Sequence, residues 1–281
     1  MLTQKEVITS KQNPTVKKIS SLSDKKGRRV EGLFRFDGIK LFGEAVACGL
    51  DVKYVVLCDR ADENILSSVE SAVACGTLAS DKIMLVSEGV FEKLSEQKAP
   101  EGIITVASFI GQKHREISAC ATDSYSVSVG ERILIAESLR DPGNLGTVIR
   151  SCAALGIDRL IISSDCADLY NPKTIRGAMG GLFRLNIDIV ELDAMPRLIS
   201  ALRASGRRIF AAALHTEALT IGELKLRASD CFVIGNEGHG LSAATVGACD
   251  ACAIIPMVEG SESLNAAAAA AICIWETVRA K

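Results

Sequence analysis

The sequence lacks the features that would mark a membrane protein, a secreted protein or an ordinary dinucleotide-binding enzyme. No uninterrupted apolar run is long enough to span a bilayer, and the N-terminal segment MLTQKEVITSKQNP contains no apolar signal core. The G-x-G-x-x-G fingerprint of dinucleotide-binding folds does not occur in the chain. We therefore expect a cytoplasmic protein with no membrane partner, and an ordinary Rossmann enzyme loses much of its support.

The chain also lacks the cysteine spacing of a zinc site or a disulfide framework, although it contains ten cysteines. Most of them lie inside apolar segments, such as Cys58 after YVVL and Cys273 within AICIW, where cysteine behaves as a small hydrophobic residue. The Cys-x-x-Cys from Cys249 to Cys252 has no second pair at zinc-site spacing. We expect reduced, buried thiols and no bound metal.

The overall charge is too small to indicate nucleic-acid binding, because the formal net charge is only −2. The segment 1–32 differs, since it holds eight basic residues against three acidic ones, a local excess of five. The basic residues are Lys5, Lys11, Lys17, Lys18, Lys25, Lys26, Arg28 and Arg29, and the acidic ones are Glu6, Asp24 and Glu31. Such a patch can engage phosphates even in an acidic protein, although a solvated helical face would have the same composition.

Residues 1–111 alternate between short apolar runs and helical stretches, which predicts a small α/β/α domain. The expected strands are 33–38, 52–58, 83–86 and 103–109, and the expected helices are a basic N-terminal helix, 39–47, 62–74 and 88–96. The apolar periodicity then lapses, and polar residues dominate 112–130. We interpret this stretch as a linker, with His114 solvated inside it. Residues 131–281 form the second expected domain.

Three segments of the second domain each end an apolar run with glycine or proline followed by polar residues. The first, RILIAESLRDPGNLGTVIR, places Asn144 near a helix start, a position suited to capping, with Gly146 and Arg150 further along. The second is CFVIGNEGHGLS, and the third is IIPMVEGSESLNAAAAAAICIW, whose six alanines give a helix with a thin side. Because strand carboxyl ends converge in an open α/β sheet, we expect the three segments to build one site.

These segments resemble the three motifs of the SpoU (TrmH-like) family of RNA 2′-O-ribose methyltransferases, within the SPOUT superfamily. The first shows N-x-G-x-x-x-R, the second G-N-E-G, and the third spans residues 254–275. The resemblance implies that the C-terminal domain is an α/β fold with a deep trefoil knot. FDGIKLFGEAV and its surroundings look like the ribosomal-protein-like (L30e-like) RNA substrate-binding domain of such proteins. The resemblance to the family also implies a homodimer whose site lies at the dimer contact, with the alanine-rich helix near the interface.

The resemblance implies transfer of a methyl group from S-adenosyl-L-methionine to a ribose 2′-hydroxyl, with rRNA favoured over tRNA as the substrate. The residues it implies for catalysis are Arg150, Asn144, Glu237, Ser263 and Asn265, and those for the cofactor are Gly235, Ile255, Met257 and Leu264. The candidate RNA-binding residues are Lys17, Lys18, Lys25, Lys26, Arg28, Arg29, Lys173 and Arg176. A catalytically silent RNA-binding or ribosome-assembly protein stays open as an alternative. A small-molecule α/β enzyme would leave the basic N-terminal segment unexplained.

Arg150 is the family's candidate for activating the hydroxyl, but arginine is a poor base. Its free pKa lies above ~12, so removing its proton at neutral pH costs on the order of 7–8 kcal/mol. We therefore favour Arg150 as a phosphate clamp and a source of positive field, with any base role dependent on contact with RNA. Much of the catalysis should then be positioning of the hydroxyl against the methyl group.

Overall fold

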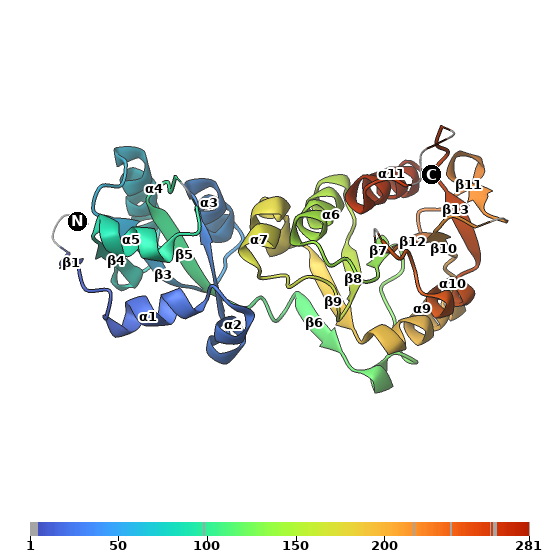
Figure 1. Cartoon of the computed structure of the whole chain (residues 1–281), viewed down its shortest axis with the longest axis horizontal. Helices are drawn as coiled ribbons and strands as arrows, with labels where there is room; N and C mark the ends of the chain where they lie inside the picture. The colour runs from blue at the N-terminus through green and yellow to red at the C-terminus, as the bar shows by residue number, and fades with distance from the viewer. Residues whose placement is uncertain are drawn as a thin grey trace. The chain divides into compact units, whose positions relative to one another are not determined.

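The chain folds into two compact units, shown in Figure 1. The computed structural model describes residues 5–97, 99–215, 217–236, 238–258, 260 and 263–280. The first unit comprises Met1–Ile110 together with Tyr170–Arg176, and the second comprises Gly111–Leu169 and Gly177–Lys281.

The first unit is a five-stranded mixed sheet covered by helices on both faces. The strand order is β1-β4-β3-β5-β2. Strands β1 (Val7–Ile8), β4 (Ile83–Val86) and β3 (Val52–Cys58) are parallel to one another. Strand β5 (Ile103–Ser108) pairs antiparallel with both β3 and β2 (Leu33–Asp37). Its helices are α1 (Pro14–Ser21), α2 (Lys25–Glu31), α3 (Ile39–Ala47), α4 (Glu63–Ala74) and α5 (Glu88–Leu94). One core packs α1 and α5 against the sheet, and a second core packs α3 and α4. The alternation predicted from the sequence is thus confirmed here.

The basic N-terminal segment forms two helices where one was expected. Asn13 caps α1 through its Oδ1, which accepts from Thr15 N at 2.9 Å, and Asp24 Oδ1 accepts from Gly27 N at 2.7 Å to cap α2. The segment ISSLSD (19–24) therefore contains both the end of one helix and the cap of the next, which interrupts the helical pattern.

The second unit is built on an eight-stranded, wholly parallel sheet. Its order is β11-β13-β10-β12-β7-β8-β9-β6, with β11 Leu219–Thr220, β13 Ala251–Ile254, β10 Ile209–Ala212, β12 Cys231–Ile234, β7 Ile133–Ala136, β8 Arg159–Ser163, β9 Asn186–Val190 and β6 His114–Ile117. The helices are α6 (Pro142–Leu155), α8 (Gly181–Arg184), α9 (Met195–Ala204), α10 (Ala243–Ala248) and α11 (Ala266–Arg279), whereas α7 (Pro172–Ala178) is divided between the two units after Arg176. In Figure 1, α9 and α10 cover one face of this sheet, and α6 and α11 cover the other. The two central strands, β12 and β7, precede the second and the first motif, respectively.

The segment 112–130, expected as a linker, belongs to the second unit. Strand β6 lies within it and pairs in parallel with β9, and Tyr125 is buried in the core. His114 was expected to be solvated, yet it is only 9% exposed, and its Nε2 donates to Leu182 O at 3.0 Å. The linker interpretation was wrong because β6 is a short edge strand with polar residues that are individually paired.

Those pairs centre on Asp188 of β9, a fully buried carboxylate. Arg115 donates to both of its oxygens at 2.8 Å, Arg159 donates at 2.9 Å, and Tyr125 Oη donates at 2.5 Å. Burial alone would raise the pKa of Asp188, but hydrogen bonds from Arg115 and Tyr125 and the charge of Arg159 hold it below its ordinary value. The network joins β6, β8 and β9, and removing one buried partner from such a network typically costs about 3–5 kcal/mol.

His114 makes the stability of the second unit depend on mildly acidic pH. Burial lowers the pKa of His114 to about 4, whereas an unfolded histidine titrates near ~6.5. Below pH ~6.5 the unfolded state binds a proton that the folded state does not, so stability is complete above that pH and falls by about 1.4 kcal/mol per unit toward pH 4.

Between pH 6.5 and 5, the free energy of unfolding of His114→Gln should fall by about 2 kcal/mol less than that of the wild type, because glutamine does not titrate. Urea unfolding followed by the fluorescence of Trp275, the single tryptophan of the chain, reports on this unit. Equal losses in the two proteins would show that other groups control the acid transition.

Candidate functional site

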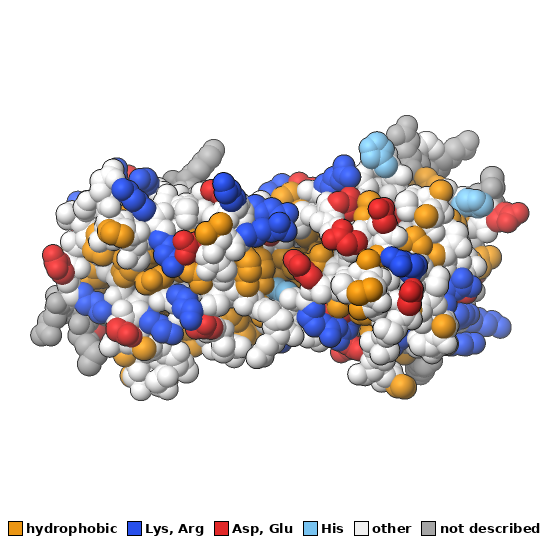
Figure 2. Space-filling model, turned by 90° about the horizontal axis from the view of Figure 1, so that it is seen from below, with side chains coloured by type: hydrophobic (Ala, Val, Ile, Leu, Met, Phe, Trp, Pro, Cys, Tyr) orange, Lys and Arg blue, Asp and Glu red, His pale blue; other side chains and the backbone are white. Residues whose placement is uncertain are grey.

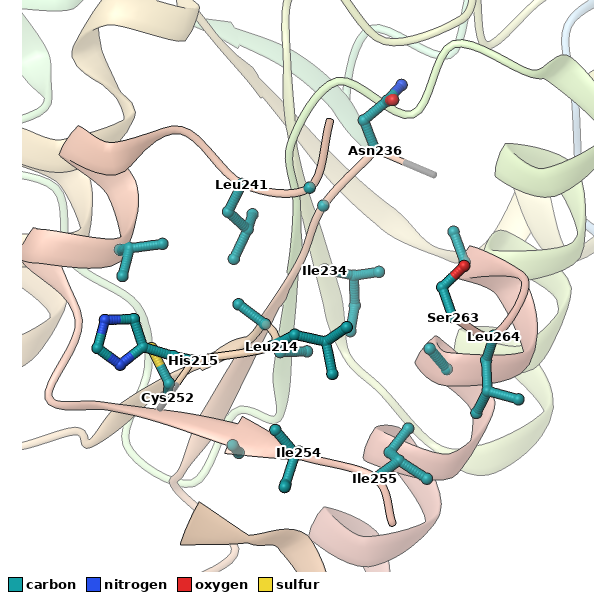
Figure 3. A pocket seen from close by; sticks show the side chains of 18 of the residues that line it. Leu214, His215, Ile234, Asn236, Leu241, Cys252, Ile254, Ile255, Ser263 and Leu264 are labelled. Carbon is teal, nitrogen blue, oxygen red and sulfur yellow. The ribbon is translucent and has the colours of Figure 1, made fainter. Parts of the chain in front are cut away.

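A cavity of about 390 Å³ opens at the carboxyl ends of β10, β12 and β13 (Figure 3). Its walls are largely apolar, with Ile254 and Ile255 from the end of β13, Leu241 from the loop after β12, and Leu264 at the start of α11. Figure 3 shows Ser263 beside Leu264 on one side of the hollow, and His215 on the other. Two of the three segments expected to build one site, those that follow β12 and β13, line this cavity, and the first segment does not.

The loop after β12 is closed on itself by hydrogen bonds. Asn236 N donates to Gly240 O at 3.1 Å, and Gly240 N donates to Asn236 O at 2.9 Å. The side-chain Oδ1 of Asn236 accepts from Gly238 N and His239 N at 2.8 and 3.2 Å. Asn236 therefore uses its side chain to shape the loop.

Glycine at 235 is required by this closure. A Cβ there would lie 2.6 Å from Gly240 C and 2.7 Å from Leu241 N, distances that real Cβ atoms do not show. Because the obstructing atoms are backbone, no side-chain rotation relieves the overlap. The first glycine of the second motif thus brings two backbone strands into contact at the cavity wall.

Helix α11 begins directly at the cavity and is tied to α6. Asn265 caps α11 through Oδ1, which accepts from Ala267 N at 3.0 Å, while its Nδ2 donates to Asn144 Oδ1, also at 3.0 Å. The two asparagines expected from separate motifs are therefore in direct contact. Their bond fixes the third motif against the first.

The start of α6 differs in one detail from the expectation. The cap is Asp141, whose Oδ1 accepts from Asn144 N at 2.8 Å, with Pro142 in the first helical turn. Asn144 thus lies inside the helix, which frees its side-chain Oδ1 to accept the bond from Asn265. Aspartate followed by proline is itself a strong helix start and explains the shift of the cap.

Gly146 and Arg150 face different surroundings along α6. Gly146 is buried, and a Cβ added to Gly177 would lie 3.2 Å from its Cα, so the two glycines let α6 and the end of α7 pack closely. Arg150 is exposed, and among the residues that the structure describes it has no ion-pair or hydrogen-bond partner. Its guanidinium is therefore exposed to solvent on α6.

The structure places the expected cofactor residues and the expected catalytic residues differently. Gly235, Ile255, Met257 and Leu264 all line the cavity, as does Ser263 from the catalytic group. Asn144, Asn265 and Arg150 do not line it, and Glu237 lies outside the described residues. The cavity also includes residues that sequence reasoning did not select, among them His239, Leu241 and Cys252.

The cavity's histidine and cysteine side chains do not form a metal centre. His215 lines the cavity, and its Nδ1 accepts from Glu217 N at 3.3 Å. Cys252 also lines the cavity, and burial raises the pKa of its thiol. Within the described ranges, no three His, Cys, Asp or Glu residues gather closely enough to hold a metal ion.

The candidate RNA-binding residues differ in their exposure. Arg28 is 3% exposed and donates to Leu22 O and Ser23 O at 2.9 and 2.8 Å, so its selection as a phosphate ligand was wrong. Lys18 pairs with Glu31 at 2.8 Å. The others, all exposed, are Lys17, Lys25, Lys26, Arg29, Lys173 and Arg176. On the face shown in Figure 2, basic side chains of the first unit are interspersed with acidic ones.

No helix in the described part of the chain is both long and apolar enough to cross a membrane.

Comparison with known proteins shows two matched regions. Residues 131–275 match the SpoU rRNA Methylase family, and residues 13–105 match the MRM3-like substrate binding domain. The 23S rRNA (guanosine(2553)-2′-O)-methyltransferase RlmP of Bacillus subtilis (strain 168) is 30% identical over 268 residues, which cover 95% of this chain and 97% of that protein. The 23S rRNA (guanosine-2′-O-)-methyltransferase RlmB of Coxiella burnetii is 31% identical, covering 81% of this chain and 87% of its own.

A solved structure supports the same assignment. The AdoMet-bound rRNA methyltransferase from Sinorhizobium meliloti superposes with a TM-score of 0.79 at 26% identity, covering 98% of this chain and 97% of that one. The match extends through both units, and the second and third motifs follow β12 and β13, whose ends surround the cavity. The chain belongs to the SpoU rRNA methylase family.

Proposed function

We propose that this protein transfers a methyl group from S-adenosyl-L-methionine to a ribose 2′-hydroxyl of rRNA, in the cytoplasm. The proposal rests on the cavity. All four residues that were expected to contact the cofactor line it. Relatives that match nearly the full chain are named as 23S rRNA 2′-O-methyltransferases, which favours rRNA over tRNA.

The cavity suits an adenosine-containing cofactor in size and chemistry. Its volume of about 390 Å³ falls within the range of roughly 300–1,000 Å³ typical of small-molecule sites. Ile255 and Leu264 offer apolar surface for a purine ring, and Gly235 exposes backbone without a side chain. Asn236 and Ser263 supply polar groups at the wall. When bound, the cofactor supplies an electrophilic methyl group on its sulfonium.

The chain's own residues would then place the ribose and its phosphate. Arg150 is exposed on α6 and keeps its charge at neutral pH, so it can hold a phosphate with a bidentate fork while its field favours a developing oxyanion. The Asn144–Asn265 bond fixes α6 to the start of α11 beside Leu264. Ser263 can accept or donate a hydrogen bond from the cavity side. Positioning is the main contribution of these groups.

Calorimetric titration with S-adenosylmethionine and transfer of a tritiated methyl group to 23S rRNA from a deletion strain test the proposal. We expect cofactor binding and incorporation at one ribose, which ribose-methylation mapping of the deletion strain's RNA identifies. Cofactor binding without transfer to any rRNA or tRNA would favour the RNA-binding or assembly role. Absence of cofactor binding would refute the enzyme assignment.

We also infer that the second unit is the knotted SPOUT fold and that the first is L30e-like. Support for the knot comes from the segment after β13, whose helix α11 packs against α6 while β12 sits between β10 and β7. Support for the L30e-like unit comes from its central sheet with helices on both faces. An experimental density map that traces residues 235–265 continuously decides the threading.

Basic residues on α2 should contribute to RNA affinity. Lys25 and Lys26 are exposed, so neutralising both with Lys→Gln changes should reduce the salt dependence of binding. Each lost phosphate contact lowers the slope of log affinity against log salt by about 0.7–0.9, giving about 1.4–1.8 for two. Filter binding of 23S rRNA fragments across a salt series measures this. A matched control neutralises Lys40 and Lys93, which are exposed on α3 and α5. Equal salt slopes in the two variants would show that Lys25 and Lys26 of α2 make no particular contribution to RNA binding.

We propose that the protein is a homodimer with α11 near the interface. Ala268 and Trp275 are both exposed, and their spacing of seven residues places them on one side of α11. Trp275 is 55% exposed, a large apolar surface for a protein to leave in water. Ala268→Trp should add bulk at this contact and shift light scattering toward the monomer mass. Ala204→Trp, at an exposed end of α9, is the control. A monomeric wild type at micromolar concentration would contradict the proposal.

A further inference from the structure

A buried carboxylate at the end of β7 ties this strand to the loop that forms one wall of the cavity. Glu137 directly follows β7, and its side chain is 2% exposed. Its Oε1 accepts from Ser242 N at 2.6 Å, and its Oε2 accepts from the Thr245 hydroxyl. Its own backbone N donates to Ile234 O at 2.8 Å, where β12 ends.

These bonds hold the far end of the loop 235–242, and Ser138 holds the near end. Asn236 Nδ2 donates to Ser138 O at 2.9 Å. Ser138 has a positive φ of 57° and is anchored by its N–H, which donates to Ser163 Oγ at 2.7 Å. Hydrogen bonds to Glu137 and Ser138 thus anchor the loop before and after Gly240 and Leu241, which line the cavity.

Placing a carboxylate in this buried position is energetically unfavourable unless its hydrogen bonds compensate. Burying it removes favourable hydration, and the cost is recovered only if its oxygens are hydrogen-bonded. The Glu137 contacts go to the backbone of Ser242 and the side chain of Thr245, which lie just after the cavity wall in sequence. We propose that Glu137 is a positioning residue that holds the loop 235–242 in its cofactor-binding conformation. This role rests on the proposed cofactor function of the cavity.

Cofactor affinity, kinetics and thermal stability together distinguish positioning from general support of the fold. Glu137→Ala should raise the Kd and KM for S-adenosylmethionine by about 10- to 100-fold, because the wall is misplaced, with a smaller change in kcat. Glu137→Gln retains an acceptor for Ser242 N and should give a smaller rise. Thr245→Val, which removes one donor, should raise Kd in the same direction. Calorimetry, steady-state transfer and a melting curve are measured on the full chain.

Asp188→Asn provides the matched control, because it disturbs a buried carboxylate network in the same unit whose members do not line the cavity. We expect it to lower the melting midpoint while the cofactor Kd stays within about twofold. If Glu137→Ala does not fold, Glu137→Gln and Thr245→Val decide. Unchanged Kd in both, or an equal rise in Asp188→Asn, would overturn the positioning role. A wild-type protein that does not bind S-adenosylmethionine would instead refute the proposed function itself.

Discussion

Arg150→Ala should reduce methyl transfer by at least about 10²–10³-fold while leaving cofactor affinity within a few-fold. The split is expected because Arg150 does not line the cavity and has no partner among the described residues. Under the proposed function, the substitution removes a charge that would meet the RNA and leaves the cavity lining unchanged. Tritiated-methyl transfer to the cognate rRNA, calorimetric cofactor titration and a melting curve measure the three quantities separately.

Arg150→Lys should be nearly as damaging as the alanine variant. Lysine keeps the positive charge but loses the planar fork that can hold a phosphate and point at a hydroxyl together. Thr147→Ala, an exposed change one turn earlier on α6, serves as the control and should retain transfer. Substantial activity in Arg150→Lys would remove the bidentate argument, and full activity in Arg150→Ala would exclude the residue from the mechanism. A parallel fall in melting point and cofactor binding would indicate a structural arginine.

The buried strands of both units were predictable because each is a compact apolar run between turn signals. Residues 133–136 and 231–234, for example, are buried throughout, as expected of central parallel strands. The short edge strand β6 was missed because its sequence, HREI, has no apolar run. Its stability depends on Arg115 pairing with Asp188, a contact across 73 residues that no local pattern reveals.

The candidate site was predictable to the extent that glycine and proline mark strand ends. The four residues predicted to contact the cofactor lie on those turns, and the structure places all of them along the cavity. Glu137 was not selected because in the sequence it looks like one polar residue after a strand. Arg28 was selected by charge alone and proved buried, because its guanidinium donates to the carbonyls of Leu22 and Ser23 in the turn between α1 and α2. Burial of a charged group depends on neighbours in space, so composition could not separate Arg28 from the exposed Arg29.

Gly235→Ala should remove most cofactor affinity, by at least about 10²-fold, through one added methyl group. The new Cβ would lie 2.6 Å from Gly240 C, and the loop cannot move away without breaking the paired backbone bonds between Asn236 and Gly240. Overpacking of this kind typically costs about 1–3 kcal/mol, so we expect a folded protein with a lowered melting midpoint. The displaced segment includes Leu241, and the wall that faces the cofactor shifts with it.

The same loop contains its own control. A Cβ at Gly238 would lie 3.4 Å from Asn236 Oδ1, an ordinary contact, and Gly238 has no positive φ that an alanine would strain. Gly238→Ala should therefore keep cofactor affinity within about threefold, although it differs from Gly235→Ala by only three positions in the chain. Calorimetric titration of both variants, with melting curves, measures the contrast. Equal loss in the two variants would mean that the loop tolerates no alanine at all. Wild-type affinity in Gly235→Ala would show that the contact between the two backbone strands does not shape the cofactor wall.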